Sequence, residues 1–388
     1  MKRDSSILAA LGLAVQLALS VEWFRGIRKM PVLGSTDDAS NLEQYPSLSV
    51  IVPARDEERA VGEGVGSALI QDYPGDLEVI AIDDRSADRT AEILDRLNVG
   101  HLNLRVFHVK DLPEGWLGKN HALYLGAREA AGDWLLFTDA DVRFSPRCFK
   151  EAVGYAARNG LDHLTLFPEI VSRGALLEGF VAVFAWAFLM GQRPWRAGEP
   201  GTKEHVGIGA FNLIRRKAYK EIGTHRAIAM RPDDDLKLAK LVKKHGFKQG
   251  AAFGTELLGV EWHQSLKGAV RGLSKSIFPG VDYRLDTLAY ATLLLLLTNV
   301  LPFAGLVFAA RGARILFGIN VLLIFTTYRY QAGYSKVKAP LWGAALHPLS
   351  VCIWICAMWR SACVTLANDG IEWRGTKYPL KSLKANIL

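Results

Sequence analysis

Two aspartates that stand one residue apart, Asp139 and Asp141, have the clearest chemical meaning in this sequence. They follow a strand-like run that extends from Trp134 to Thr138. Along a strand, residues i and i+2 face the same side, so the two carboxylates are expected to converge. Ligands of open α/β sheets bind just beyond the carboxyl ends of the strands, and Mg²⁺ there takes one or two carboxylates plus phosphate oxygens. The pair therefore predicts a divalent cation that holds a phosphate-bearing substrate.

Strand-like and helix-like segments alternate ahead of this pair. Strands are predicted at 48–52, 77–82 and 104–109, and helices at 58–70, 88–97 and 119–131. The alternation predicts parallel βαβ units and a doubly wound α/β sheet. The polar residues after the first two strands are Pro53, Ala54, Arg55, Asp56 and Glu57, then Asp83, Asp84, Arg85 and Ser86. Three acidic clusters are thus expected at one edge of the sheet, which is a nucleotide site in outline.

Long hydrophobic segments flank this globular region. Leu8–Phe24 is almost uninterrupted apolar sequence, and no convincing cleavage site follows it, so a retained membrane anchor is expected. Tyr290–Ala310 and Ala339–Trp359 are each long enough to span a bilayer, whereas Ile315–Tyr328 is shorter and ambiguous. The sequence therefore predicts an integral membrane protein.

The expected domain organisation follows from these segments. It comprises an N-terminal anchor at 1–29, a globular domain at 45–280, and a C-terminal membrane-associated region at 285–388 with two to three hydrophobic helices and a basic tail. Basic residues after the anchor place the globular domain in the cytoplasm, at the cell inner membrane. The basic tail favours the same side, yet four crossings would place it outside. One hydrophobic segment is therefore expected to be interfacial or re-entrant, and the sequence leaves open which.

Charge and cysteine content exclude some function classes. The net charge of +8 fits contact with anionic lipid head groups. It would also suit nucleic acid, but no recognition motif and no aromatic–basic interleaving is present, so no nucleic-acid partner is expected. The four cysteines have no metal-ligand spacing with histidines.

Motifs in a set order resemble the signatures of the family 2 glycosyltransferases. They are Val52–Glu57, Ile82–Thr90, Gly115–Leu123, Thr138–Asp141, Gly207–Phe211 and Asp234–Ala239. The resemblance covers roughly residues 47–278, and the order and spacing make it specific. It implies the GT-A nucleotide-diphospho-sugar transferase fold, with a Rossmann-like and mostly parallel sheet. Membrane helices are expected at both ends of the chain.

The resemblance also implies roles in binding a nucleotide-diphospho-sugar, with UDP as the expected nucleotide. Pro53, Ala54, Arg55 and Glu57 would hold the nucleoside, and Asp83 or Asp84 would accept a hydrogen bond from the base. Lys119 would approach the base or the diphosphate. Asp139 and Asp141 would bind Mg²⁺ or Mn²⁺ and the donor phosphates. The general base would be one of the acids Asp234 and Asp235. The family commonly has Glu–Asp there, so the choice stays open, and Asp235 is favoured.

The acceptor is inferred from a second stretch. The Gln-x-x-Arg-Trp motif of polysaccharide-extending members is missing from the sequence. The residues in its place resemble lipid-directed members, including hopanoid- and carotenoid-associated enzymes and ceramide glucosyltransferases. This implies that His263 and Gln264 cover the donor site and that Arg271 and Lys275 contact the diphosphate or lipid head groups. A solvated amphipathic helix accounts for Arg271 equally well.

The predicted function is a metal-dependent, inverting hexosyl transfer from a nucleotide sugar to a lipid hydroxyl. A polysaccharide-extending enzyme and a catalytically silent membrane scaffold are the alternatives. Simpler interpretations of the motifs also stand. Asp83, Asp84 and Asp88 could cap the next helix, and 233–235 could be first-turn acids that complement a helix dipole. The apolar segment 175–190 is either a core helix or an interfacial helix that guides a lipid acceptor.

Overall fold

The computed structural model describes residues 2–34, 42–335 and 344–388. Their contacts divide the chain into two compact units. The helical unit comprises Met1–Lys29, Val171–Arg193 and Trp262–Ile371, and the sheet unit comprises Met30–Ile170, Pro194–Glu261 and Glu372–Leu388. The chain therefore leaves the sheet unit and returns to it twice, whereas the sequence suggested three consecutive segments.

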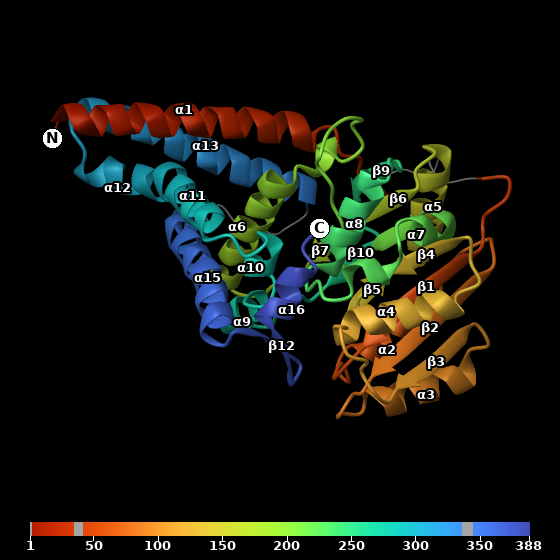
Figure 1. The fold of residues 1–388 in the computed structure, drawn as a ribbon. Helices are drawn as coiled ribbons and strands as arrows, with labels where there is room; N and C mark the ends of the chain where they lie inside the picture. The colour runs from red at the N-terminus through yellow and green to blue at the C-terminus, as the bar shows by residue number, and fades with distance from the viewer. Residues whose placement is uncertain (1, 35–41, 336–343) are drawn as a thin grey trace. The chain divides into compact units, whose positions relative to one another are not determined.

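A seven-stranded sheet forms the centre of the sheet unit (Figure 1). Its strands, in spatial order, are β3 (Leu104–Val109), β2 (Leu77–Asp84), β1 (Leu48–Ala54), β4 (Trp134–Phe137), β8 (Asn212–Arg215), β6 (His163–Phe167) and β9 (Gln249–Phe253). Strand β8 is antiparallel to both neighbours, and the other pairs are parallel. The predicted α/β fold with a mostly parallel sheet is confirmed. A second sheet pairs β5 (Val142–Phe144), β10 (Leu258–Val260) and β7 (Glu169–Ile170).

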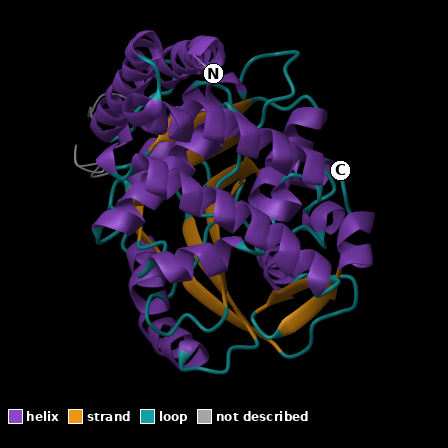
Figure 2. Cartoon of the chain, turned by 90° about the vertical axis from the view of Figure 1, so that its left-hand side faces the viewer, coloured by secondary structure: helices purple, strands orange, loops and turns teal. Residues whose placement is uncertain are grey.

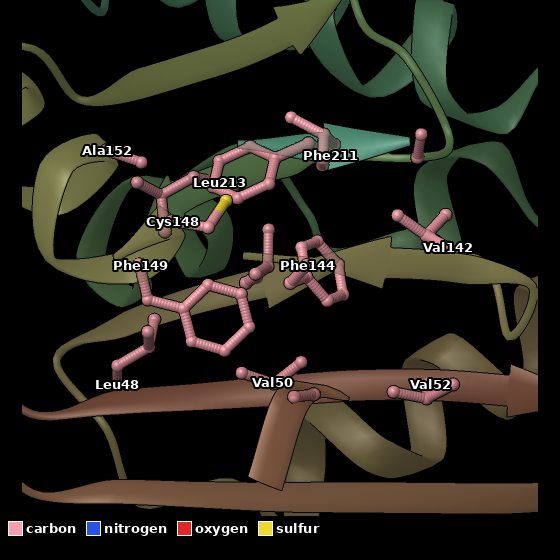
Figure 3. Close-up of a cluster of buried hydrophobic side chains, with 14 of the residues drawn as sticks. Leu48, Val50, Val52, Val142, Phe144, Cys148, Phe149, Ala152, Phe211 and Leu213 are labelled. Carbon is pink, nitrogen blue, oxygen red and sulfur yellow. The ribbon is translucent and has the colours of Figure 1, made fainter. Parts of the chain in front are cut away.

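Helices cover both faces of the large sheet because its strands are apolar on both sides (Figure 2). Val50 and Val52 of β1 face one core, where Phe149 packs (Figure 3), and Ile51 faces the other. The first core is closed by α2 (Val61–Leu69), α3 (Thr90–Gly100) and α5 (Cys148–Arg158). The second is closed by α4 (Gly118–Glu129), α7 (Arg216–Glu221), the 3₁₀ helix η3 (His225–Ile228) and α8 (Asp234–Lys244). A further 3₁₀ turn, η2, spans Pro194–Arg196.

The prediction that Asp139 and Asp141 are oriented by the alternation of a strand is wrong. Strand β4 ends at Phe137, and Asp139, Ala140 and Asp141 form the turn that leads to β5. The alternation of side chains along a strand therefore does not orient the two aspartates. The backbone N–H of Asp139 instead donates to the carbonyl of Gly209 at 3.0 Å, which fixes the turn against the 207–211 segment.

The helical unit contains long apolar helices. They are α1 (Lys2–Ile27), α6 (Ala175–Gln192), α9 (Leu266–Leu273), α10 (Ile277–Gly280), α11 (Leu285–Leu295), a π-helical stretch η4 (Leu296–Val300), α12 (Leu301–Phe308), α13 (Arg311–Ser335) and α15 (His347–Ala367). By length and composition, four segments of the described chain could cross a membrane: Ser5–Ile27, Ala175–Arg196, Leu285–Phe308 and His347–Ala367. The predicted segment 315–328 lies within α13, and part of the predicted span 339–359 falls outside the described residues.

Contacts within the helical unit set the directions of these helices. Trp23 near the end of α1 and Ala9 near its start contact Tyr330 and Phe317 of α13, so α1 and α13 run parallel. Helix α15 runs antiparallel to α11 and α12. His347 at its start lies 3.0 Å from the Asn299 side chain, and Trp359 near its end donates to Thr292 at 3.0 Å.

The chain re-enters the sheet unit after α15. Strand β11 (Gly370–Trp373), within which the boundary between the units falls, is followed by β12 (Thr376–Pro379) and α16 (Leu380–Ala385).

Candidate functional site

A half-buried lysine links the acidic clusters. Lys119 lies in the first turn of α4, and its Nζ is 2.8 Å from Asp139 Oδ1 and 3.5 Å from Asp234 Oδ1. The turn after β4, the start of α4 and the start of α8 therefore meet at one point. Burial would lower the pKa of Lys119, but the charges of Asp139, Asp234 and Asp235 outweigh it and raise that pKa. The lysine stays charged and holds the acids together.

The pair Asp139 and Asp141 is crowded with negative charge. Burial, followed by the charges of Asp139 and Glu57, raises the pKa of Asp141 to about 7. A carboxylate in such surroundings gains from a cation that replaces its proton.

The donor set fits a hard divalent ion. No group of three or more His, Cys, Asp or Glu side chains able to hold a metal occurs among the described residues. The protein would supply the pair, and substrate phosphates and water would complete the coordination, as Mg²⁺ sites commonly have it. Asp139 and Asp141 are thus the residues that would hold Mg²⁺ or Mn²⁺.

The three aspartates at the start of α8 have different environments. Asp233 forms a bidentate pair with the fully buried Arg231 at 2.9 and 3.0 Å, and Lys237 lies 3.3 Å away. Asp234 is buried and faces Lys119. Asp235 is half-buried, and its Oδ1 accepts from the N–H of Leu236 at 2.8 Å. First-turn acids and a site acid thus coexist in one segment, and Asp235 is the member best placed to meet a ligand.

Asp235 has the electrostatics of a general base. Burial and the neighbouring charge of Asp234 raise its pKa to about 7, so the group exchanges a proton near neutral pH. A small cavity of about 10 Å³ lies beside it, lined in part by Lys119, His225 and Asp234. This volume suits about one water molecule.

Two glycines let backbone approach the acids closely. A Cβ at Gly207 would lie 2.1 Å from the carbonyl oxygen of Asp235, and one at Gly209 would lie 2.6 Å from Asp139 Oδ2. Only glycine fits at either position without displacing an acid. The 207–211 segment thus lies directly against both Asp235 and Asp139.

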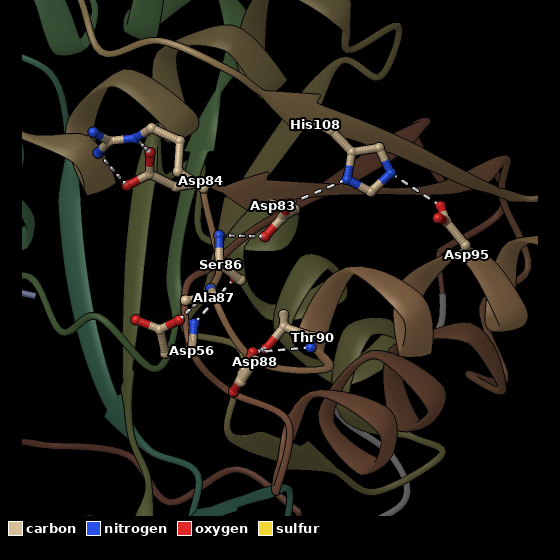
Figure 4. Close-up of polar contacts among 10 residues, drawn as sticks. Asp56, Asp83, Asp84, Ser86, Ala87, Asp88, Thr90, Asp95 and His108 are labelled. Carbon is tan, nitrogen blue, oxygen red and sulfur yellow. Dashed lines mark hydrogen bonds and ion pairs between the residues drawn. The ribbon is translucent and has the colours of Figure 1, made fainter.

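Side chains after β1 and β2 form a second cluster (Figure 4). Asp83 accepts from the N–H of Ser86 at 3.1 Å and lies 3.2 Å from His108 Nδ1. Asp84 pairs with Arg85 at 2.8 Å and with Arg55 at 3.6 Å. These contacts pre-orient the carboxylates that the sequence assigned to the nucleobase. That role stays a prediction, as do the roles of Pro53 and Ala54 in the adjoining strand end.

The helix-capping alternative for this loop is supported for Asp88. Its Oδ1 accepts from the backbone N–H of Thr90 at 2.9 Å, in the first turn of α3. Asp56 ties the two loops together, since its Oδ1 accepts from the N–H of Ala87 at 2.8 Å.

Four predicted residues belong to the helical unit. His263 and Gln264 precede α9, Arg271 lies in its last turn, and Lys275 follows it. The structure assembles the acidic cluster without them, and their roles in donor or head-group binding stay predictions. The predicted apolar segment 175–190 is also in this unit as α6, where Phe184 stacks on Trp262 with ring centroids 4.5 Å apart.

Two residues of the tail that lie near the clusters are not among the site residues predicted from the sequence. Arg374 forms an ion pair with Glu57, and the Tyr378 hydroxyl accepts from the N–H of Gly118 at 3.3 Å. No local pattern signals contact with residues some three hundred positions away.

Comparisons with known proteins agree with this geometry. The family model described as glycosyl transferase family 2 matches residues 49–223. A 4,4'-diaponeurosporenoate glycosyltransferase of Staphylococcus aureus (strain bovine RF122 / ET3-1) is 24% identical over 345 residues, covering 87% of this chain and 89% of the relative. Its counterpart from strain MRSA252 is 24% identical over 356 residues with the same coverage.

A solved structure shares the fold. The mannosyltransferase PcManGT from Pyrobaculum calidifontis, in complex with GDP-Man and Mn²⁺, has a TM-score of 0.52 at 19% identity, covering 89% of this chain and 99% of the other. The likeness to this structure and the mostly parallel sheet show the predicted GT-A fold, and residues 49–223 are similar to glycosyl transferase family 2.

Proposed function

We propose that the protein is a membrane-bound, inverting glycosyltransferase that moves a hexose from a nucleotide-diphospho-sugar to a lipid acceptor. The observation that carries the proposal is the meeting of Asp139 and Asp234 at Lys119, with Asp235 beside them. A phosphate-binding acid pair and a candidate base thus share one edge of one sheet. A scaffold that had lost catalysis would have no need of this arrangement.

The chemistry distributes tasks among these residues. A divalent ion on Asp139 and Asp141 would supply charge stabilisation for the leaving diphosphate. Asp235, on the other side of the cluster, takes the proton of the acceptor hydroxyl, and in-line attack inverts the anomeric centre. Lys119 pairs with Asp139 and Asp234 and so fixes the spacing between the two functions.

The donor is proposed to be a UDP-sugar. The strand-end carboxylates Asp83 and Asp84 are held in place by His108, Arg55 and Arg85, and acceptor groups of this kind match the N–H of a uracil edge. The structural neighbour holds GDP-Man, so UDP and GDP are both included in the test below.

The acceptor is proposed to be a carotenoid-type lipid. The relatives' names state a carotenoid-type substrate, 4,4'-diaponeurosporenoate. That name denotes a carboxylate, whereas the sequence predicted a hydroxyl. The two acceptors differ in mechanism, because a carboxylate needs no base and a hydroxyl does. The raised pKa of Asp235 favours the hydroxyl.

Location follows from the long helices. Four segments of the described chain are long and apolar enough to cross a membrane. Arg25 lies at the end of the first of them, and Arg28 and Lys29 follow it. We propose an inner-membrane protein whose sheet unit faces the cytoplasm.

The test is to incubate membranes that contain the protein with labelled UDP- and GDP-sugars and Mn²⁺, and to identify labelled lipids by mass spectrometry. One sugar per lipid, lost in both Asp139→Asn and Asp235→Asn, is the expected result. Mild alkali separates a labile ester product from a stable glycoside. Unchanged turnover in both variants would refute the catalytic assignments, and a product that grows by many sugars would refute the lipid acceptor.

A further inference from the structure

The tail is anchored to the sheet unit through α16. Leu383 is fully buried. The Asn386 side chain accepts from the N–H of Met230 at 3.0 Å, and Lys240 Nζ donates to the carbonyl of Leu388 at 2.9 Å. Lys240 belongs to α8, the helix whose first turn carries Asp234 and Asp235, and Met230 lies shortly before that helix. The tail is therefore fixed on the base side of the acidic cluster.

Strand β12 brings the same tail to the strand-end loops. Tyr378 is buried, with 6% of its surface exposed, and its hydroxyl accepts from the N–H of Gly118 at 3.3 Å. The pKa of Arg85 is raised, chiefly by its hydrogen bond to Asp84 and further by one to Tyr378. The tail thus touches both the start of α4 and the loop after β2.

Arg374 stands beside the metal-binding acids. Its guanidinium pairs with Glu57, and the charge of Glu57 reaches Asp141. The Arg374 side chain is 34% exposed, so the pairing leaves part of it open to a ligand.

The backbone of Arg374 is strained. Its φ is 49° and that of Gly375 is 74°, and together they form the two-residue turn between β11 and β12. Turns of this kind favour Asn, Asp or Gly at both positions, and a long side chain in the left-handed region is unfavourable. Strain of this sort clusters at ligand-binding sites. A side chain kept there against local preference points to a task for the guanidinium.

Carboxylates outnumber the cationic side chains around the proposed donor site. Carboxylates of Glu57, Asp139, Asp141, Asp234 and Asp235 lie along it, and Lys119 is engaged by two of them. Arg55 and Arg85 are engaged by Asp84, so an anionic diphosphate would gain from a further cationic group. We infer that Arg374 is a donor-binding residue whose guanidinium contacts the diphosphate, a role that rests on the proposed function and deepens it.

The experiment measures binding of UDP and GDP, each with Mn²⁺, to the detergent-solubilised full chain. Uridine and guanosine serve as probes without phosphate. Arg374→Gly suits the left-handed turn, so it should keep or raise the melting temperature. It should weaken binding of the nucleoside diphosphate about tenfold to hundredfold, as loss of a charge-assisted hydrogen bond does. Nucleoside binding should stay within about twofold.

Two further variants sharpen the result. Lys377→Gln removes an exposed charge from the same tail and should leave binding unchanged. Arg374→Lys keeps the charge but loses the planar fork, so it should retain part of the affinity. Diphosphate binding by Arg374→Gly equal to wild type would overturn the inference, as would an equal loss in Lys377→Gln. If the wild-type chain binds neither nucleotide, the proposed function itself fails.

Discussion

At the residue scale, the main feature of the site is that several carboxylates lie close together. Lys119 relieves part of their repulsion by pairing with Asp139 and Asp234. Burial, together with the remaining repulsion, raises the pKa values of Asp141 and Asp235, each to about 7. A metal ion bound at Asp141 and a proton taken up by Asp235 would each relieve part of this excess negative charge.

The pH dependence of the rate follows from Asp235. A base must be deprotonated, and a pKa near 7 means that the working form is lost as the pH falls below it. With a hydroxyl acceptor and saturating Mn²⁺, the single-turnover rate should fall about tenfold for each pH unit below that pKa. Asp235→Glu should retain activity and shift this acid limb. A wild-type rate that stays flat from about pH 5.5 to 8 would exclude Asp235 as the base.

At the element scale, the site depends on close approach between segments. Helix α4 supplies Lys119, and α8 supplies Asp234 and Asp235. The glycine backbone of the 207–211 segment lies against both Asp235 and Asp139. Asn120 couples two of these elements, because its buried Nδ2 lies within 2.8 to 3.2 Å of the carbonyls of Ile228, Ala229 and Arg231.

Gly207→Ala tests this arrangement. The added methyl group would meet the Asp235 carbonyl at 2.1 Å. It would push the start of α8, with Asp234 and Asp235, away from Lys119 and Asp139. The expected loss in kcat is about a hundredfold, since displacements near 1 Å have such effects. Gly66→Ala in α2 is the control, because nothing lies within 4 Å of its new Cβ. The control should keep full activity and gain up to about 1 kcal/mol of stability. Wild-type kcat in Gly207→Ala would contradict the account.

The sequence predicted local elements better than it predicted contacts between distant segments. Period and length located β1 to β4 within two residues, and β3 spans the residues expected. The strands β8 and β9, the turn conformation of the aspartate pair and the split of the chain into discontinuous units were not foreseen. Each depends on pairing between distant segments, as does the contact between Glu57 and Arg374. Local propensity contains no information about such pairing.

At the scale of the whole molecule, connectivity limits how the chain crosses a membrane. Helix α6 begins and ends next to segments of one sheet unit, since β6 before it pairs with β8 after it. A helix so placed cannot cross, although it is apolar enough. The stretch 262–371 likewise leaves and rejoins that unit, so it must cross an even number of times.

The contacts of α15 indicate which of the four hydrophobic segments predicted from the sequence does not cross. Helix α12 is followed closely by α13, so we expect α11–α12 and α13 to cross as a pair, although α13 is not among the four segments that qualify by length and composition. Helix α15 begins beside Asn299, inside the apolar stretch 285–308, and runs back towards Ser274, whose carbonyl accepts from Ser361 at 2.7 Å. It therefore enters and leaves on one side. We expect three crossings, made by α1, α11–α12 and α13.

Topology mapping tests this expectation. Tags at the two ends of the chain should lie on opposite sides of the membrane, with the C-terminal tag on the cytoplasmic side. Protease protection in sealed vesicles, before and after permeabilisation, gives the assignment. Both tags on one side would contradict three crossings.

The docking of residues 372–388 has a consequence for biosynthesis. These residues follow the candidate membrane segments of the described chain in sequence, yet they complete the unit that contains β1 and α8. A chain whose helices have been inserted in the wrong number would present its tail on the far side of the bilayer. Its sheet unit would then lack Arg374 and Tyr378. We therefore expect activity only in molecules whose insertion has finished correctly, because only in them can the tail complete the sheet unit.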